Sequence, residues 1–177
     1  GAGKSTLLKI LAGAYTKDEG EIYIEGKEVK NLTPKLAENL GISIIYQEFS
    51  SLPDLSIAEN IFLGRQYTKK GGMIDWKRCR KESRELLMQV GLEIDPSMKV
   101  SRLKVAEQQM VEIAKALSKK AKIIVMDEPT APLTQKEIDH LFRVIENLKK
   151  RQITVIYVSH RLGEIKEMCD RITVLRD

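Results

Sequence analysis

The sequence has little cysteine and no long apolar run, and these absences exclude several classes of protein. Its two cysteines, Cys79 and Cys169, lie far apart, outside any CxxC motif and without histidines at metal-ligand spacing. This pattern argues against a disulfide framework or a zinc site and favours a reducing compartment. No apolar run approaches the ~20 residues that a helix needs to cross a bilayer, so the sequence predicts no membrane-spanning segment.

The composition is that of one globular domain. The 177 residues are 42% hydrophobic and 31% charged, which argues against intrinsic disorder and allows a single sizeable core. The net charge of +5 is unevenly spread, because residues 65–104 carry eleven basic and five acidic side chains and the rest is nearly neutral. A basic excess of this size suits nucleic acid, a membrane surface or a phosphorylated ligand equally well.

Strand patterns alternate with helical periodicity along the chain. Strands are expected at 21–25, 42–46, 123–126, 153–158 and 172–175. Helices are expected at 6–14, 56–64, 75–90, 110–117 and 134–148, the second and last of them opened by capping boxes. The continuous apolar runs are typical of buried parallel strands. This order predicts an α/β core interrupted by a mainly helical insertion.

The first six residues, GAGKST, match the second half of a P-loop, GxxxxGK[ST]. Glycines let backbone N–H groups wrap around phosphate oxygens, and the following helix directs its positive end at them. Lys4 is expected to reach the β- and γ-phosphates and Ser5 to ligate Mg²⁺, the alternative being a glycine turn that only caps a helix. Because the motif is cut at its start, we expect a central, doubly buried strand to precede it. The expected phosphate-binding residues are Gly1, Ala2, Gly3, Lys4, Ser5 and Thr6.

Two adjacent carboxylates, Asp127 and Glu128, follow the apolar run 123–126. Ligands of open α/β sheets bind at the carboxyl ends of the strands, where Asp127 would hold Mg²⁺ or its water. Glu128 would orient or deprotonate an attacking water. Together with the P-loop, the pair favours a nucleotide-hydrolysing site over a solvated acidic turn.

Further segments, in order, resemble the motifs of ABC transporter ATPases. Residues 46–48 (YQE) are similar to the Q-loop, and residues 103–109 (LKVAEQQ) to the signature segment. Residues 130–133 (TAPL) are similar to the D-loop, and residues 158–160 (VSH) to the segment of the switch histidine. The chain is most similar to the first nucleotide-binding domain of monosaccharide importers of the ribose, xylose and galactose type, and the resemblance covers nearly all of it.

This resemblance implies a P-loop NTPase (RecA-like) fold. Its core would have a mainly parallel sheet, a small antiparallel β part and an inserted α-helical subdomain. Residues 1–48 and 119–177 would form the ATPase core, and residues 49–118 the helical subdomain with the signature segment. In the resembled importers a second nucleotide-binding domain follows in the same polypeptide.

The resemblance also implies a role for each matching residue. Gln47 would contact Mg²⁺ or the attacking water, beside the Mg²⁺ ligands Ser5 and Asp127. His160 would hydrogen-bond the γ-phosphate and hold Glu128 and the water in line, whereas His140 is expected to be a surface residue. The signature residues would cover the ATP held by an opposite domain; they are Leu103, Lys104, Val105, Ala106 and Glu107.

Two residues depart from the family pattern. Lys104 replaces a serine that donates to the γ-phosphate, and its longer side chain cannot copy that short hydroxyl contact. Pro132 fixes φ and removes a donor in the D-loop. We expect both to bear on the efficiency of the composite site and neither to touch ATP binding by the P-loop.

These features predict an ATP-binding and ATP-hydrolysing subunit of an ABC importer for a small solute, with a monosaccharide as the favoured cargo. ATP and Mg²⁺ would be its cofactors. It would pair head to tail with a second nucleotide-binding domain at the cytoplasmic face of the membrane, contact a membrane-spanning permease and serve a periplasmic solute-binding protein indirectly. The alternatives are a nucleoside-importer ATPase, a soluble ABC ATPase acting on ribosomes or nucleic acid, and a non-catalytic binding domain. The basic segment lacks the interleaved aromatics of nucleic-acid surfaces, so no nucleic acid is expected as partner.

Overall fold

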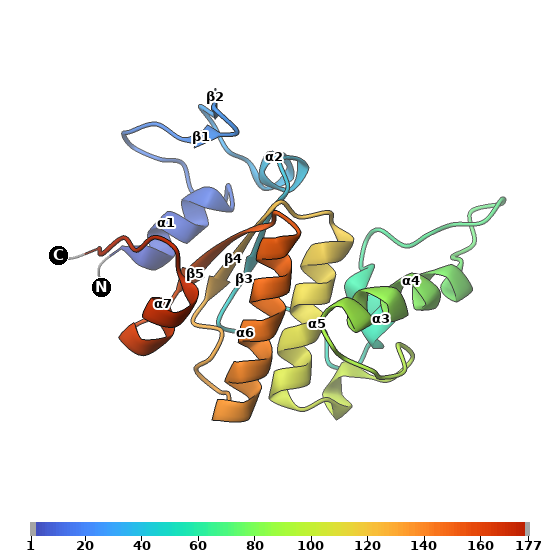
Figure 1. Cartoon of the computed structure of the whole chain (residues 1–177). Coiled ribbons are helices and arrows are strands. Elements are labelled where there is room, and N and C mark those ends of the chain that lie inside the picture. Colours follow the sequence, from blue (N-terminus) through green and yellow to red (C-terminus); the bar gives the residue numbers. More distant parts are fainter. Residues whose placement is uncertain (1–2, 176–177) are drawn as a thin grey trace.

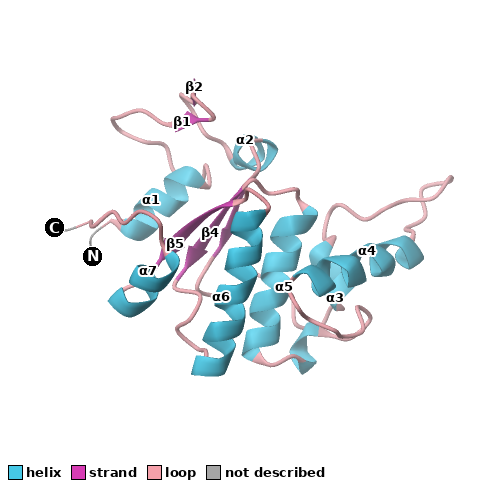
Figure 2. Cartoon of the chain, in the orientation of Figure 1, coloured by secondary structure: helices cyan, strands magenta, loops and turns pink. Residues whose placement is uncertain are grey.

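Helices and strands alternate toward both ends of the chain, and a block of helices lies between β3 and β4 in the sequence (Figures 1 and 2). The computed structural model describes residues 3–175. Within these residues, no helix is long and apolar enough to cross a bilayer. In chain order the elements are α1 (Lys4–Leu11), β1 (Tyr23–Ile24), β2 (Lys27–Glu28), α2 (Pro34–Asn39), β3 (Ile42–Ile45), α3 (Ile57–Ile61), α4 (Trp76–Gln89), the 3₁₀ turn η1 (Val100–Arg102), α5 (Val105–Ser118), β4 (Ile123–Asp127), α6 (Gln135–Lys150), β5 (Thr154–Val158) and α7 (Leu162–Met168).

The main sheet has three parallel strands in the order β3-β4-β5, with β4 in the centre. Ile45 pairs with Met126, and Asp127 pairs with Val158. The middle of β4 is fully buried, as expected for a central parallel strand. Because all three strands run the same way, their carboxyl ends lie at one edge of the sheet. Residues that follow these ends are therefore brought together from distant parts of the sequence.

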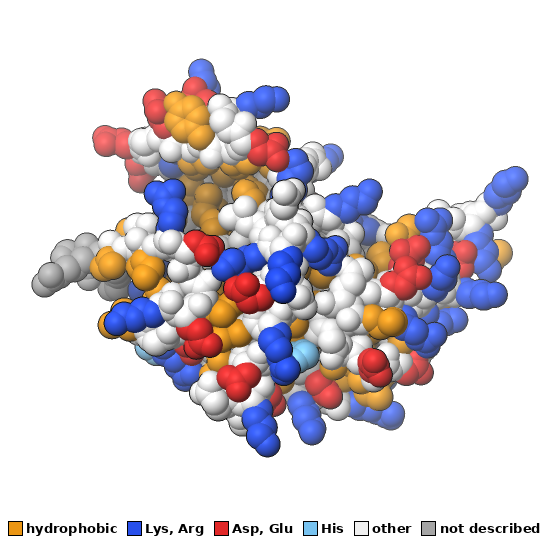
Figure 3. Space-filling model, in the orientation of Figure 1, with side chains coloured by type: hydrophobic (Ala, Val, Ile, Leu, Met, Phe, Trp, Pro, Cys, Tyr) orange, Lys and Arg blue, Asp and Glu red, His pale blue; other side chains and the backbone are white. Residues whose placement is uncertain are grey.

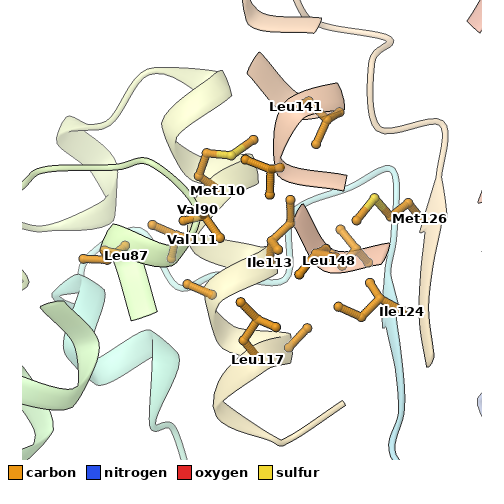
Figure 4. Close-up of a cluster of buried hydrophobic side chains, with 14 of the residues drawn as sticks. Leu87, Val90, Met110, Val111, Ile113, Leu117, Ile124, Met126, Leu141 and Leu148 are labelled. Atoms are coloured by element: carbon orange, nitrogen blue, oxygen red, sulfur yellow. The ribbon is translucent and has the colours of Figure 1, made fainter. Parts of the chain in front are cut away.

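Two groups of buried side chains hold the elements together. The larger group joins β4 to α6 and α5 and extends among α3 and α4 (Figure 4). Ile113, Ile124 and Leu141 are fully buried in it and come from α5, β4 and α6 respectively. The smaller group packs α2 and the antiparallel β1–β2 pair against β3. The predicted fold class, with its mainly parallel sheet and small antiparallel part, is confirmed.

Both predicted capping boxes are present. At the start of α3, the backbone N–H of Ser56 donates to Glu59 Oε2 at 2.7 Å, and the Glu59 N–H donates to Ser56 Oγ at 3.3 Å. At the start of α6, the Thr134 N–H donates to Glu137 Oε2 at 2.8 Å. These bonds satisfy N–H groups that the first helical turn leaves unpaired. Local sequence therefore determines where α3 and α6 begin.

One predicted strand is absent from the described part of the chain. Residues 172–175 belong to no strand, and Ile172, Val174 and Leu175 are 54%, 79% and 42% exposed. The segment follows α7 and lies along a groove beside α1 and β5. The prediction of a strand from its apolar pattern is wrong here, because a strand forms only where a neighbouring strand accepts and donates its backbone hydrogen bonds. The strand expected at 21–25 is likewise shorter, since only Tyr23–Ile24 pairs.

The basic excess of residues 65–104 lies mainly on α4. Five exposed cations of this helix border one shallow surface region that also includes Asp75 and Glu82. Figure 3 shows the corresponding gathering of blue side chains at the end of the molecule far from α1. The cations are Lys77, Arg78, Arg80, Lys81 and Arg84.

Candidate functional site

Helix α1 begins with Lys4 and Ser5, immediately after Gly3. Gly3 has a φ of +79°, in the left-handed region that favours glycine. A Cβ added to Gly3 would meet nothing within 4 Å, so backbone conformation alone calls for glycine there. The first N–H groups of α1 are thus presented at the end of the helix, where phosphate oxygens can accept from them. Two of the predicted phosphate-binding residues lie outside the described residues: Gly1 and Ala2.

The two predicted acidic residues lie at the carboxyl edge of the sheet. Asp127 is the last residue of β4. The backbone N–H of Glu128 donates to the carbonyl of Val158 at 2.9 Å and extends the pairing with β5 by one residue. Glu128 then adopts a φ of +47°, which is uncommon for a residue with a Cβ. This conformation turns the chain out of the sheet at the point where the carboxylate stands.

The charges around Asp127 favour a bound cation. Burial raises the pKa of Asp127 above its ordinary value, the neighbouring Glu128 carboxylate raises it further, and the Lys4 ammonium partly lowers it. The hydroxyl of Ser5, the carboxylate of Asp127 and the amide of Gln47 are oxygen donors of the kind that Mg²⁺ prefers. These donor types therefore fit a magnesium ion, whose remaining ligands would come from nucleotide phosphates and water.

A hydrogen bond joins the two residues predicted to handle the attacking water. His160 Nδ1 lies 3.1 Å from Glu128 Oε1. Glu128 comes one residue after β4 and His160 two residues after β5, so the parallel pairing of these strands brings them together. The His160 side chain is 66% exposed and that of Glu128 is 24% exposed. The pair thus stands at a surface that a ligand can reach.

Gln47 lies near the same edge of the sheet. It follows the last residue of β3, Ile45, by two positions, and Ile45 pairs with Met126 in β4. Its side chain is exposed. The three strand ends thus place Gln47, Asp127 and His160 side by side in the order β3, β4, β5.

The signature segment stands apart from these residues. Lys104 is exposed at the N-cap of α5, and its backbone N–H donates to Glu107 Oε2 at 2.7 Å. Leu103 is buried, whereas Val105 is 40% exposed. Among residues 3–175, no hydrogen bond or ion pair joins segment 103–107 to Lys4 or to the two acidic residues of β4 and its turn. Lys104 is therefore an exposed cation at the start of α5.

Two buried or half-buried residues have roles that the sequence patterns did not indicate. The carboxylate of Glu164 in α7 accepts from Tyr157 OH at 2.8 Å and from Thr130 Oγ1 at 2.9 Å. The second is His140, a half-buried residue whose Nε2 lies 3.1 Å from the carbonyl oxygen of Val90. The Thr130–Glu164 and Val90–His140 contacts span 34 and 50 residues, so no local spacing could have revealed them.

The fold and the site define a P-loop nucleotide-binding protein, and a family model described as ABC transporter matches residues 1–131. The chain belongs to the ABC transporter family, as the sequence motifs predicted. In a solved structure of "a post-hydrolysis state of the ATP-binding cassette MJ0796 bound to ADP and Pi", described as dimeric, the similar chain is 29% identical with a TM-score of 0.74. That similarity covers 92% of this chain and 72% of that chain.

Curated relatives include sugar-import proteins. The chain is 56% identical over 178 residues to the ribose import ATP-binding protein RbsA of Clostridium perfringens (strain 13 / Type A), covering 100% of this chain and 36% of the relative. It is 49% identical over 179 residues to the xylose import ATP-binding protein XylG of Geobacillus kaustophilus (strain HTA426), covering 100% and 35%. The chain thus spans about a third of the length of these relatives.

Proposed function

We propose that this chain is the ATP-binding and ATP-hydrolysing part of an ABC importer, and that ATP turnover drives uptake of a monosaccharide. The observation that carries the proposal is the hydrogen bond between Glu128 and His160, formed beside Asp127 at the carboxyl edge of the sheet. The sugar assignment is supported by the relatives, whose names specify ribose and xylose import.

In this mechanism the start of α1 holds the nucleotide. Its free N–H groups donate to phosphate oxygens, and the ammonium of Lys4 neutralises the β- and γ-phosphates. Ser5, Asp127 and Gln47 would hold Mg²⁺, which supplies charge stabilisation at the phosphoryl group when bound.

Hydrolysis then requires a water molecule in line with the γ-phosphate. The Glu128 carboxylate accepts a hydrogen bond from this water and orients it, or takes its proton. His160 Nδ1 holds the Glu128 carboxylate from one side, and the exposed ring would donate from Nε2 to the γ-phosphate when both ring nitrogens carry a proton. Phosphoryl transfer needs positioning and charge stabilisation more than covalent chemistry, and the Glu128 and His160 pair supplies the positioning of the water.

We further propose a head-to-tail pair of such domains. Lys104 is exposed at the start of α5 and, among the described residues, makes no hydrogen bond or ion pair with Lys4, which leaves it free to cover a partner's nucleotide. The dimeric cassette among the solved structures supports pairing. Residues 1–48 and 119–177 would form the ATPase core and residues 49–118 the subdomain that carries the signature segment. This pair would sit at the cytoplasmic face of the membrane against a permease, which a periplasmic solute-binding protein loads.

The direct test is ATP turnover of Glu128→Gln in the full protein, with any neighbouring segments included. We expect kcat to fall at least about tenfold, equivalent to about 1.4 kcal/mol in the barrier, with nucleotide binding retained. Lys4→Ala should instead weaken nucleotide binding, because it removes the cation at the phosphates. Glu93→Gln, at an exposed carboxylate in the loop after α4, is the matched control. Turnover that Glu128→Gln leaves unchanged would refute the assigned mechanism.

The cargo is tested by uptake. Cells that lack their own ribose and xylose importers, supplied with the full protein and its permease, should accumulate labelled ribose or xylose in a manner abolished by Glu128→Gln. Uptake of nucleosides alone would replace the monosaccharide assignment with the nucleoside alternative.

A further inference from the structure

Glu164 of α7 is a buried carboxylate with an unusually full set of donors. Glu164 is only 9% exposed. Thr130 Oγ1 lies 2.9 Å from each of its oxygens, Tyr157 OH donates at 2.8 Å, Ser159 Oγ at 3.1 Å and Arg161 Nη1 at 3.2 Å. Three hydroxyls and one guanidinium thus converge on one carboxylate, which is enough to occupy most of its acceptor positions.

Three of these four donors come from the two turns that carry the hydrolytic pair, and the fourth, Tyr157, lies in β5. Thr130 follows Glu128 by two residues in the turn after β4. Ser159 and Arg161 flank His160 in the turn after β5. Glu164 itself lies on a third element, α7, and contacts both turns at once.

The bonds around Ser159 also close the turn that contains the histidine. Ser159 Oγ donates to Glu164 and accepts from the backbone N–H of Arg161 at 3.0 Å. The residues on both sides of His160 are thereby linked to the Glu164 carboxylate through the Ser159 hydroxyl. Arg161 is held twice, by its backbone N–H and by its guanidinium.

Such anchoring matters because His160 has little packing of its own. Its side chain is 66% exposed, so neighbouring side chains do not set its position. The 3.1 Å contact with Glu128 therefore depends on where the two turns hold the backbone. A shift of about 1 Å in one turn would lengthen this contact beyond hydrogen-bonding range.

The carboxylate is held in its charged form. Burial by itself would raise the pKa of Glu164, but hydrogen bonds from Tyr157, Thr130, Arg161 and Ser159 more than offset it and lower the pKa below the ordinary value. A charged acceptor makes shorter and stronger hydrogen bonds than a neutral one. The network is therefore stiffest when Glu164 is ionised.

We propose that Glu164 is a positioning residue for ATP hydrolysis: it clamps the turn after β4 to the turn after β5 and so holds His160 against Glu128. The proposal rests on the proposed function of the Glu128 and His160 pair. This positioning role differs from simple stabilisation of α7, because it predicts that altering Glu164 lowers ATP turnover while nucleotide binding is retained.

The test compares two variants of the full protein, one altered at Glu164 and one at its hydrogen-bond donor Thr130. Glu164→Gln keeps the size of the side chain and removes its charge. Thr130→Val keeps the shape of the β4 turn and removes one donor, which leaves the contacts of α7 with β5 in place. Glu167→Gln, an exposed carboxylate on the same helix, is the control.

We expect both Glu164→Gln and Thr130→Val to lower kcat about tenfold while the KM for ATP and the affinity for nucleotide change less than about twofold. Because both act through one contact, the double variant should lose no more than the stronger single variant. Thermal unfolding of each variant shows whether it is folded at the assay temperature. If the variants are folded and the double variant loses the sum of the two single losses in kcat, the proposal is overturned in favour of a purely structural role. The same holds if kcat and the KM for ATP change together.

The two proposals fail in different ways. If the parent hydrolyses ATP and Glu128→Gln abolishes turnover while Glu164→Gln and Thr130→Val leave kcat unchanged, only the positioning role of Glu164 is wrong. If the parent protein does not hydrolyse ATP, or Glu128→Gln keeps full turnover, the proposed function fails and the role of Glu164 fails with it.

Discussion

His160 Nδ1 lies 3.1 Å from Glu128 Oε1, although the two residues are 32 positions apart in the sequence. The contact crosses from the end of β5 to the end of β4, where Asp127 pairs with Val158. Its geometry depends on the register of two parallel strands and on the turns that follow them. The hydrolytic pair is therefore a product of the sheet edge and not of either segment alone.

Replacing this histidine should separate turnover from binding. We expect His160→Ala to lower kcat at least about tenfold, because Glu128 loses the partner that orients its carboxylate, while nucleotide binding at α1 persists. Phosphate release and nucleotide titration measure the two effects. His140→Ala is the matched control, since His140 contacts the Val90 carbonyl and should affect the free energy of unfolding but not kcat. Equal losses of kcat in the two variants would contradict the assignment.

The lysine in the signature segment is open to a direct test. Lys104→Ser supplies a short hydroxyl, and a serine at the N-cap of α5 can complete a capping box with Glu107. We expect the free energy of unfolding to rise by about 1 kcal/mol, measured by urea unfolding, and ATP turnover to rise as well. Lys99→Ser removes an exposed cation nearby and should change neither. A fall in turnover for Lys104→Ser would show that the lysine serves as a phosphate contact.

Two glycines with similar backbones should respond differently to alanine. Gly13 and Gly20 have φ of +72° and +82°, so alanine at either pays for a left-handed conformation, about 1–2 kcal/mol. At Gly13 the added Cβ would also fall 2.6 Å from the Thr33 carbonyl oxygen, whereas at Gly20 it meets nothing within 4 Å. We expect Gly13→Ala to lower the free energy of unfolding by a further 1–3 kcal/mol, roughly the cost of overpacking. If urea unfolding gives similar losses in the free energy of unfolding for both variants, the loop at Thr33 moves enough to accommodate the added Cβ at residue 13.

The exposed edge of β5 predicts the behaviour of residues 1–177 expressed alone. β5 pairs with β4 on one side, and its other side borders a groove of about 700 Å³ between α1 and α7. Ile156 is 37% exposed on this edge. Within residues 3–175 no strand pairs with this edge. An apolar strand edge of this kind invites association with other chains, and the groove adjoins Lys4 of the phosphate site. We expect poor solubility and weak ATP binding, measured by sedimentation and calorimetry. A cooperative thermal transition together with micromolar ATP affinity would refute this expectation.

The motifs predicted the elements best where a local interaction decides the outcome. The capping boxes at Ser56 and Thr134 form within four residues, so the starts of α3 and α6 could be read directly. The apolar run 123–126 could be read as a central strand because a strand buried on both faces needs apolar residues throughout. The segment 172–175 has a similar pattern but forms no strand, since the pattern does not specify a hydrogen-bonding neighbour.

By itself, the sequence determined the family, the order of the elements and the residue types of the candidate site, because GAGKST, Asp127-Glu128 and His160 are short patterns whose chemistry is local. Only the tertiary structure decided which groups meet. The register of β4 and β5 brings His160 to Glu128, and the packing of α7 brings Glu164 to Thr130, 34 residues away. Such contacts depend on how strands pair and helices dock, and a periodicity of apolar residues does not encode the partner of a buried carboxylate.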